Sequence, residues 1–186
     1  MFLLIIAILV LIASLTFFAY LFESEYNVFS KDGVIYYSTN LTLQGPHLED
    51  IIRRRIPEQE ISQYTLVEPG AGLARVAEYL SKRFAWKKIV VMDRGPVIKM
   101  LGRMRLKLRG VKTEYQGGNI FNLDFPTKAV VYCYLYPQLI DKLKAQGKFD
   151  DRLVISLSFA LSDVEPTETI AFDGWQSPLY VYDFRK

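Results

Sequence analysis

The sequence predicts an α/β protein with a doubly wound, mostly parallel seven-stranded sheet and a C-terminal antiparallel hairpin, preceded by one transmembrane helix. Three observations support this fold class. Residues 2–22 are apolar and carry no charge, and residues 64–157 alternate strand-like runs with helix-like runs. The last two strand-like runs are separated only by the turn-forming sequence of residues 173–178. Alternating strands and helices are typical of a Rossmann-like sheet covered on both faces.

The apolar stretch at residues 2–22 is long enough for a membrane anchor. Its 21 residues, mostly Leu, Ile, Phe and Ala, would form a helix of roughly 32 Å, which matches the hydrocarbon core of a bilayer. A secretory signal peptide is the alternative, but such peptides begin with basic residues and end in a small-x-small cleavage site. The sequence begins Met-Phe-Leu-Leu and continues past residue 22 with Glu23, which favours a retained anchor.

The remaining elements follow in order along the chain. A short helix is expected over 48–56, because Pro57 ends it. Strands are expected over 64–67, 88–92, 112–116, 129–133, 152–157, 167–172 and 179–184. Helices are expected over 74–83, 96–109 and 138–146. In a sheet of this kind the ligand binds beyond the carboxyl ends of the strands, near the point where the strand order reverses.

The composition excludes several classes of site. Cys133 is the single cysteine, so no internal disulfide forms, and with His47 as the single histidine a Cys/His zinc site cannot be assembled. No metal ligands are therefore expected. The Gly-x-Ser-x-Gly sequence of serine hydrolases is absent, and His47 is expected in a Gly-Pro-His turn, unsuited to a catalytic triad.

A glycine-rich turn joins the first strand to the first helix of the sheet. Its sequence is Glu68-Pro69-Gly70-Ala71-Gly72-Leu73-Ala74. A dinucleotide fingerprint needs a third glycine where Arg75 stands, and a phosphate-binding loop needs a Gly-Lys-Ser/Thr sequence that is missing. An acid followed by Gly-x-Gly instead fits the first motif of S-adenosylmethionine-binding proteins. A purely structural turn is the alternative reading.

Polar residues at the ends of the next two strands support a nucleoside ligand. Asp93 ends the second strand, where one carboxylate can accept hydrogen bonds from both hydroxyls of a ribose. It is equally placed to cap the helix that Pro96 begins. Asn119, after the third strand, offers an amide where an adenine amino group would lie, although Gly118-Asn119 is also an ordinary turn sequence.

Together these motifs resemble the membrane-anchored lysine methyltransferases of the ATP synthase c-subunit type and their prokaryotic relatives. The resemblance covers roughly residues 33–184. It rests on the glycine turn and on Asp93-Arg94-Gly95-Pro96. It also rests on residues 131–143, which contain Tyr134-Leu-Tyr136-Pro137 and end in Lys-Leu, and on residues 155–161 followed by Pro166.

The resemblance implies a class I S-adenosylmethionine-dependent methyltransferase domain over 61–186, an anchor over 1–22, and a linker with an N-terminal lid helix over 23–60. Expected cofactor contacts are Glu68, Pro69, Gly70, Ala71, Gly72, Asp93, Arg94, Asn119, Ile120 and Tyr134. Residues expected at the methyl-transfer centre are Tyr134, Tyr136 and Pro137. The chain departs from the family's pattern at Leu73, Ala74 and Asn119, which replace an acid, a glycine and an acid.

Tyr134 and Tyr136 follow the fourth strand, where the reactive methyl group should point. Their aromatic faces would attract a sulfonium or an alkylammonium by roughly 0.5–2 kcal/mol. A spacing of two residues predicts that both side chains lie on the same side of the chain, which could instead be the core side.

Basic residues are concentrated between Lys87 and Lys112, where nine Lys or Arg accompany one acid on a chain of net charge +3. In the expected helix 96–109, Val97, Leu101, Met104 and Leu108 fall on one face and the cations elsewhere. Such a helix is most simply solvated, with anionic lipid headgroups and nucleic acid as alternative partners.

Three function classes follow from these observations. The favoured one is a membrane-tethered methyltransferase of a protein lysine, with the catalytic domain on the cytoplasmic side, where the cofactor is made. The second is a methyltransferase of a lipid, quinone, other small molecule or RNA, and the third is a module that binds the cofactor without catalysis.

Overall fold

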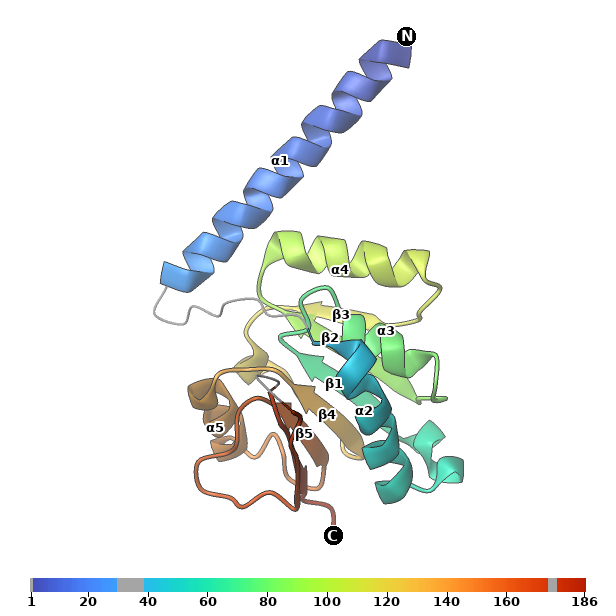
Figure 1. The fold of residues 1–186 in the computed structure, drawn as a ribbon, viewed down its shortest axis with the longest axis vertical. Helices are drawn as coiled ribbons and strands as arrows, with labels where there is room; N and C mark the ends of the chain where they lie inside the picture. Colours follow the sequence, from blue (N-terminus) through green and yellow to red (C-terminus); the bar gives the residue numbers. More distant parts are fainter. Residues whose placement is uncertain (1, 30–38, 174–176) are drawn as a thin grey trace.

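A computed structural model describes residues 2–29, 39–173 and 177–186, and its central feature is a seven-stranded sheet of order β3-β2-β1-β4-β5-β7-β6 (Figure 1). The strands are β1 (Thr65–Pro69), β2 (Lys88–Asp93), β3 (Glu114–Gly117), β4 (Ala129–Cys133), β5 (Leu153–Leu157), β6 (Glu168–Ile170) and β7 (Leu179–Asp183). The helices are α1 (Phe2–Phe29), α2 (Leu41–Arg55), α3 (Arg75–Ser81), α4 (Pro96–Leu108) and α5 (Pro137–Ala145), with 3₁₀ turns η1 (Glu58–Gln63) and η2 (Ile120–Asn122).

The pairing of the strands confirms the predicted sheet. Strands β1 to β5 pair in parallel, and β7 pairs antiparallel with both β5 and β6. The three strands β1, β4 and β5 are buried along their whole length, which explains why they read as continuous apolar runs rather than as alternating patterns. The strand order reverses between β1 and β4, so the loop after β1 lies at the switch point.

Two hydrophobic cores lie on opposite faces of the sheet. The first core packs α2, α3 and α4 against one face through residues such as Ile51, Leu80 and Leu106. The second core packs α5 against the other face through Ile140 and Leu143. Figure 1 shows α5 on the far side of the sheet from α2 and α3. This arrangement leaves the carboxyl edge of the sheet for the loops that follow the strands.

Helix α2 begins at Leu41, seven residues before the predicted start, and includes the Gly45-Pro46-His47 sequence that was expected to form a turn. Asn40 caps it by accepting a hydrogen bond from the backbone N–H of Leu43. A side chain at Gly45 would meet the ring of Tyr79 on α3 at 2.5 Å. Glycine is therefore needed here for the close approach of two helices, which local sequence does not reveal.

Ion pairs join the end of α2 to the last two strands. The guanidinium of Arg54 contacts the carboxylate of Glu168 at 2.7 Å, and that of Arg55 contacts the same carboxylate at 2.9 Å. Arg55 also approaches Asp183 of β7 at 3.6 Å. These cations hold the pKa of the Glu168 carboxyl below its usual range, Arg54 most strongly. The N-terminal helix of the domain is thus tied to its C-terminal hairpin.

Helix α1 extends away from the sheet and touches the rest of the chain at α4 (Figure 1). It does not end with the apolar stretch at residue 22 but runs on through Glu23 and Glu25 to Phe29. No helix in the described part of the chain combines the length and the apolar character that crossing a membrane requires. The transmembrane helix predicted over residues 2–22 is therefore not confirmed. Of the predicted turn at residues 173–178, residues 174–176 lie outside the described residues.

We expect removal of residues 1–22 to leave a folded domain. Both hydrophobic cores of the described residues draw on positions from Leu41 onward, so the deletion takes no side chain from either. The free energy of unfolding should change by less than ~1 kcal/mol, which is about 2–4 °C in Tm for a domain of this size. Circular dichroism melts of the two chains in the same detergent measure this. Loss of the cooperative transition would show that α1 is an integral part of the fold.

Candidate functional site

The turn after β1 places three left-handed residues within a five-residue stretch. Gly70 has φ 71°, Gly72 has φ 55° and Ala74 has φ 52°. The two glycines take this conformation at no steric cost, as predicted. Ala74 begins α3 in a conformation that costs roughly 1–2 kcal/mol for a residue with a Cβ. The position where the resembled family has a third glycine is therefore also left-handed in this chain.

The peptide groups of Gly72 are held from two neighbouring strands. Its N–H donates to the carboxylate of Asp93, at the end of β2, at 2.7 Å. Its carbonyl accepts from the hydroxyl of Tyr115, on β3, at 2.7 Å. The N–H of Ala71 donates to the carbonyl of Met92 at 2.8 Å. The turn is thus fixed by hydrogen bonds to β2 and β3.

Close packing also requires Gly70 and Gly102 to lack a side chain. A Cβ at Gly70 would meet the side chain of Leu135, after β4, at 2.6 Å. A Cβ at Gly102, on the inner face of α4, would meet the carbonyl of Gly72 at 2.8 Å and the ring of Tyr115 at 2.7 Å. Helix α4 therefore packs directly on the glycine turn.

Glu68 lies beneath the turn and is buried, with 5 % of its surface exposed. Its carboxylate accepts a hydrogen bond from the backbone N–H of Ala77, in α3, at 2.8 Å. Burial raises the pKa of the Glu68 carboxyl from 4.5 to about 8, against the stabilising effect of that N–H. The acid of the motif therefore joins β1 to α3 and is largely protonated at neutral pH.

Asp93 is partly buried beside the turn and is not the N-cap of α4, because Gly95 holds that position without a side-chain hydrogen bond. Besides Gly72, it accepts a hydrogen bond from the N–H of Gly95 at 3.1 Å, just before α4 begins. Burial raises the pKa of its carboxyl, and the N–H groups of Gly95, Gly72 and Arg94 oppose that shift. Each carboxylate oxygen has a second lone pair, so these hydrogen bonds leave acceptor capacity for a ligand.

The residues predicted after β3 and β4 lie on the same edge of the sheet. Asn119 is exposed and its side chain accepts from the N–H of Phe121 at 3.1 Å, which caps η2. Ile120 packs against the second core. Pro137 is exposed at the first position of α5.

Tyr134 and Tyr136 do not share one side of the chain, contrary to the prediction. Tyr134 is half-buried against the first core. The ring of Tyr136 lies 5.7 Å from that of Phe159, which packs against the second core. The alternation continues past β4 through Tyr134 and Leu135, which pack against the first and the second core, and it ends at Tyr136, the N-cap of α5.

Sequence reasoning missed several residues of this site. Tyr115, Leu135 and Gly102 act through contacts with the glycine turn, and the side chain of Lys99 lies against Gly117 at the end of β3. Ser158, after β5, has φ 70°, and its buried hydroxyl has no hydrogen-bond partner among the described residues. No local sequence pattern marks these positions.

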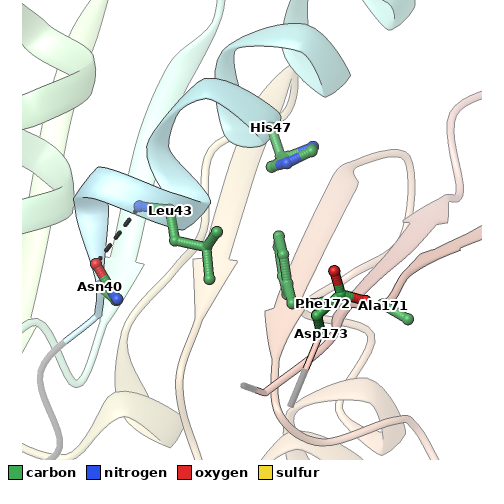
Figure 2. A pocket seen from close by; sticks show the side chains of 6 residues that line it. All are labelled: Asn40, Leu43, His47, Ala171, Phe172 and Asp173. Atoms are coloured by element: carbon green, nitrogen blue, oxygen red, sulfur yellow. Dashed lines mark hydrogen bonds between the residues drawn. The ribbon is translucent and has the colours of Figure 1, made fainter. Parts of the chain in front are cut away.

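An open pocket of about 600 Å³ lies farther along the same edge, between α2 and the segment after β6. Figure 2 shows Leu43 and His47 from α2 facing Phe172 and its neighbours across the gap, with Asn40 at the start of the helix. The lining residues are Asn40, Leu43, His47, Ala171, Phe172 and Asp173. The rings of His47 and Phe172 meet edge to face, with centroids 5.1 Å apart.

The strand register places this pocket at the carboxyl edge. Leu179 pairs with both Leu157, the last residue of β5, and Ile170, the last residue of β6. The pocket residues 171–173 therefore follow at the level where β5 ends. The glycine turn and the pocket thus lie on one edge, with the ends of β4 and β5 between them.

The described ranges 2–29, 39–173 and 177–186 contain no cluster of three His, Cys, Asp or Glu side chains that could hold a metal ion. The free thiol of Cys133 is buried within β4, and burial raises its pKa. The Cys133 thiol is therefore not available as a reactive group at the edge of the sheet.

Solved structures share this fold. An RNA methyltransferase from Salinibacter ruber in complex with S-adenosyl-L-homocysteine is 20 % identical with a TM-score of 0.64, over 81 % of this chain and 95 % of that one. The rRNA methyltransferase AviRa from Streptomyces viridochromogenes is 11 % identical with a TM-score of 0.58, over 84 % and 88 % of the two chains. An O-methyltransferase from Bacillus cereus is 11 % identical with a TM-score of 0.52, over 78 % and 66 %.

No protein-family model matches the sequence, and neither does any of the curated proteins compared with it. The structural neighbours establish the class I methyltransferase fold. The resemblance to the ATP synthase c-subunit lysine methyltransferases remains a prediction.

The buried carboxyl of Glu68 should make stability depend on pH. A carboxyl whose pKa is raised to about 8 on folding stabilises the protein fully below pH 4.5, and that stabilisation is lost as the pH rises towards 8. The loss is on the order of 3–5 kcal/mol. Glu68→Gln keeps an acceptor for the N–H of Ala77 and cannot ionise, so this part of the loss should be absent in the variant.

Urea unfolding of parent and variant between pH 5 and pH 8.5 measures the difference. The parent should lose stability relative to Glu68→Gln as the pH rises, while other groups, Asp93 included, titrate in both chains. Equal pH dependence of the two proteins would show that Glu68 is ionised in the folded state.

Proposed function

We propose that this protein is an S-adenosylmethionine-dependent methyltransferase, tethered to a membrane, that methylates a lysine side chain of a protein. The observation that carries the proposal is the glycine turn, held against Asp93 at the switch point of a class I methyltransferase sheet. The remaining support comes from the pocket farther along the same edge.

The residues of the turn fit the cofactor. Gly70 and Gly72 present backbone without Cβ atoms, so a ligand can approach the main chain closely. Asp93 retains acceptor capacity for ribose hydroxyls, and Asn119 and Ile120 border the place for an adenine beyond β3. Glu68 faces inward, so its part is to hold the turn in place through Ala77.

The pocket beneath α2 suits an alkylammonium acceptor. Asp173 supplies a negative charge, Phe172 and Leu43 supply apolar surface for a methylene chain, and His47 supplies an imidazole. Imidazole is the side chain best suited to accept a proton near neutral pH. A lysine entering between α2 and residues 171–173 would approach the carboxyl edge of the sheet at its β6 end, whereas the glycine turn lies at β1.

When bound, the cofactor supplies a methyl group on a sulfonium. An acceptor nitrogen would have to be neutral and aligned with the carbon–sulfur bond of the cofactor. His47 lines the pocket and would accept the proton that a lysine ammonium must lose. The protein's contribution is alignment and exclusion of water. Tyr134, half-buried between the turn and the pocket, would face the sulfonium by cation–π attraction.

Helix α1 supports the proposed tether. Large apolar side chains from Leu4 to Phe18 are exposed along it, with exposed fractions of 41–68 %. Exposed apolar surface of this extent is typical of contact with a membrane or a partner. The catalytic domain would lie on the cytoplasmic side, where the cofactor is made.

RNA is the second candidate acceptor. Two of the three structures reported above are described as methyltransferases of RNA or rRNA, and α4 carries two exposed cations, Arg103 and Lys107. The carboxylate of Asp173 in the pocket favours a cationic acceptor over a phosphate backbone, which is why lysine is preferred.

Binding of S-adenosylmethionine should depend on Asp93 more than on the rigidity of the turn. Asp93→Ala should lower the affinity about a hundredfold, because two hydrogen bonds to a carboxylate contribute roughly 3 kcal/mol. Tyr115→Phe removes the hydrogen bond to the carbonyl of Gly72 without removing a proposed ligand contact, so it should lower the affinity only a few-fold. Calorimetry with S-adenosylmethionine measures both.

Tyr182→Phe is the matched control. Its hydroxyl accepts from the N–H of Leu161 at 2.8 Å, away from the glycine turn, so the variant should lose stability but not affinity. Equal affinities of Asp93→Ala and Tyr115→Phe would reduce Asp93 to a positioning residue. Absence of binding to the parent chain would disprove the proposed activity.

Asp173→Asn should separate acceptor binding from cofactor binding. Removal of the charge should lower kcat/KM for a lysine acceptor by about 10–100-fold, while the affinity for S-adenosylmethionine stays unchanged. Asp163→Asn, an exposed acid in the segment after β5 that does not line the pocket, is the control.

The assay follows tritiated methyl groups into the protein, lipid and RNA fractions of membranes incubated with each variant. Label in protein that is lost with Asp173→Asn supports a lysine acceptor. Label in RNA or lipid that is insensitive to Asp173→Asn would leave the methyltransferase activity standing and overturn the acceptor assignment.

A further inference from the structure

Helix α4 has apolar residues on two faces, one buried against the domain and one exposed. Ile98, Gly102 and Leu106 are its buried residues. Met100, Met104 and Leu108, spaced four residues apart, stand on one outward face with exposed fractions of 53, 55 and 77 %. Leu101, beside them, is half-buried. The helix thus carries an exposed apolar stripe opposite its buried face.

Cations border this stripe on both sides, and helix α4 contains no acidic residue. Arg103 and Lys107 are exposed on one flank, and the half-buried Arg105 lies on the other. Arg103 is held in place, because its guanidinium donates to the carbonyl of Tyr115 at 2.7 Å. Arg105 pairs with Glu78 at 2.6 Å, which offsets the charge on its side.

Helix α1 continues this apolar surface. It contacts α4, and its own exposed apolar side chains extend from Leu4 to Phe18. In Figure 1 α4 lies between α1 and the sheet, so both apolar surfaces lie on the same side of the domain.

We propose that the outer face of α4 is a docking surface for an anionic lipid bilayer, with Met100, Met104 and Leu108 in the headgroup–acyl boundary and the flanking cations on lipid phosphates. An apolar stripe with basic flanks is the pattern of helices that lie in the plane of a membrane interface. This docking adds a second contact to the tether at α1 and does not depend on the reaction that the domain catalyses.

Charge decides between this partner and the alternatives. In a symmetric pair of α4 helices, the flanking cations of one copy would face those of the other, which is repulsive. A nucleic acid would satisfy the cations but would leave the Met and Leu side chains without an apolar partner, since flexible aliphatic chains are not stacking platforms for bases. An anionic bilayer offers phosphates to the cations and acyl chains to the Met and Leu side chains.

The test uses the full chain in vesicles with a spin label at Met104→Cys. The thiol of Cys133 is buried, so the label reaches the introduced cysteine. Ala145→Cys, exposed at the end of α5 on the opposite face of the sheet, is the control. Vesicles are phosphatidylcholine alone or with phosphatidylglycerol, and collisions with oxygen and with a water-soluble nickel chelate report depth.

With phosphatidylglycerol present, the label at position 104 should gain collisions with oxygen and lose collisions with the chelate, while the label at position 145 stays in water. Lys107→Gln in the Met104→Cys chain should shift the docking equilibrium roughly fivefold towards the undocked state, because one cation near an anionic surface is removed. Added salt should act in the same direction.

Three results would overturn the proposal. The label at position 104 could report the same aqueous environment as the label at position 145 in every vesicle. It could show dipolar broadening that grows with protein density, which identifies a second copy as the partner. It could become immobilised only when RNA is added, which identifies nucleic acid.

Discussion

The hydrogen-bonded peptide groups of Gly72 are the point on which the site depends. One strand end supplies an acceptor for its N–H, through Asp93, and the neighbouring strand supplies a donor for its carbonyl, through Tyr115. Both groups lie in the interior of the edge, where an unpaired backbone group would cost roughly 1–3 kcal/mol. The left-handed turn therefore has a fixed place relative to β2 and β3 before any ligand arrives.

The fixed position of this turn also explains which residues lie on the inner faces of α3 and α4. Gly102 lets α4 approach the carbonyl of Gly72, and Glu68 ties β1 to the start of α3 from below. The buried acid is tolerated there because burial raises the pKa of its carboxyl and so favours the neutral form, and because it receives the N–H of Ala77. Helix α4 consequently has two surfaces with separate duties: an inner face that supports the turn, and an outer face whose chemistry suits a lipid surface.

Much of the fold could be predicted from the sequence, because strands buried on both faces must be continuously apolar and helices between them must be amphipathic. The strands β1, β2, β4 and β5 follow from that rule, and the antiparallel end follows from the turn-forming sequence between the last two strand-like runs. The start of α2 could not, since Gly45 and Pro46 have the local signature of a turn, and the need for glycine at position 45 comes from the distant ring of Tyr79. Tyr115 was missed for a similar reason: its hydroxyl acts on a residue 43 positions earlier. The functional roles of Asp93, Asn119 and Tyr134 remain predictions.

The ion pairs between α2 and the last two strands set the order in which the domain can be completed. Arg54 and Arg55 belong to the first helix of the domain, whereas Glu168 and Asp183 belong to its last strands, and β7 is inserted between β5 and β6. During synthesis, the helix that roofs the pocket must wait for nearly the whole chain before it meets these partners. The glycine turn, built from β1, β2 and β3, has all its partners much earlier. The partners of the two halves of the edge therefore leave the ribosome at different times, and those of the wall that would receive an acceptor leave it last.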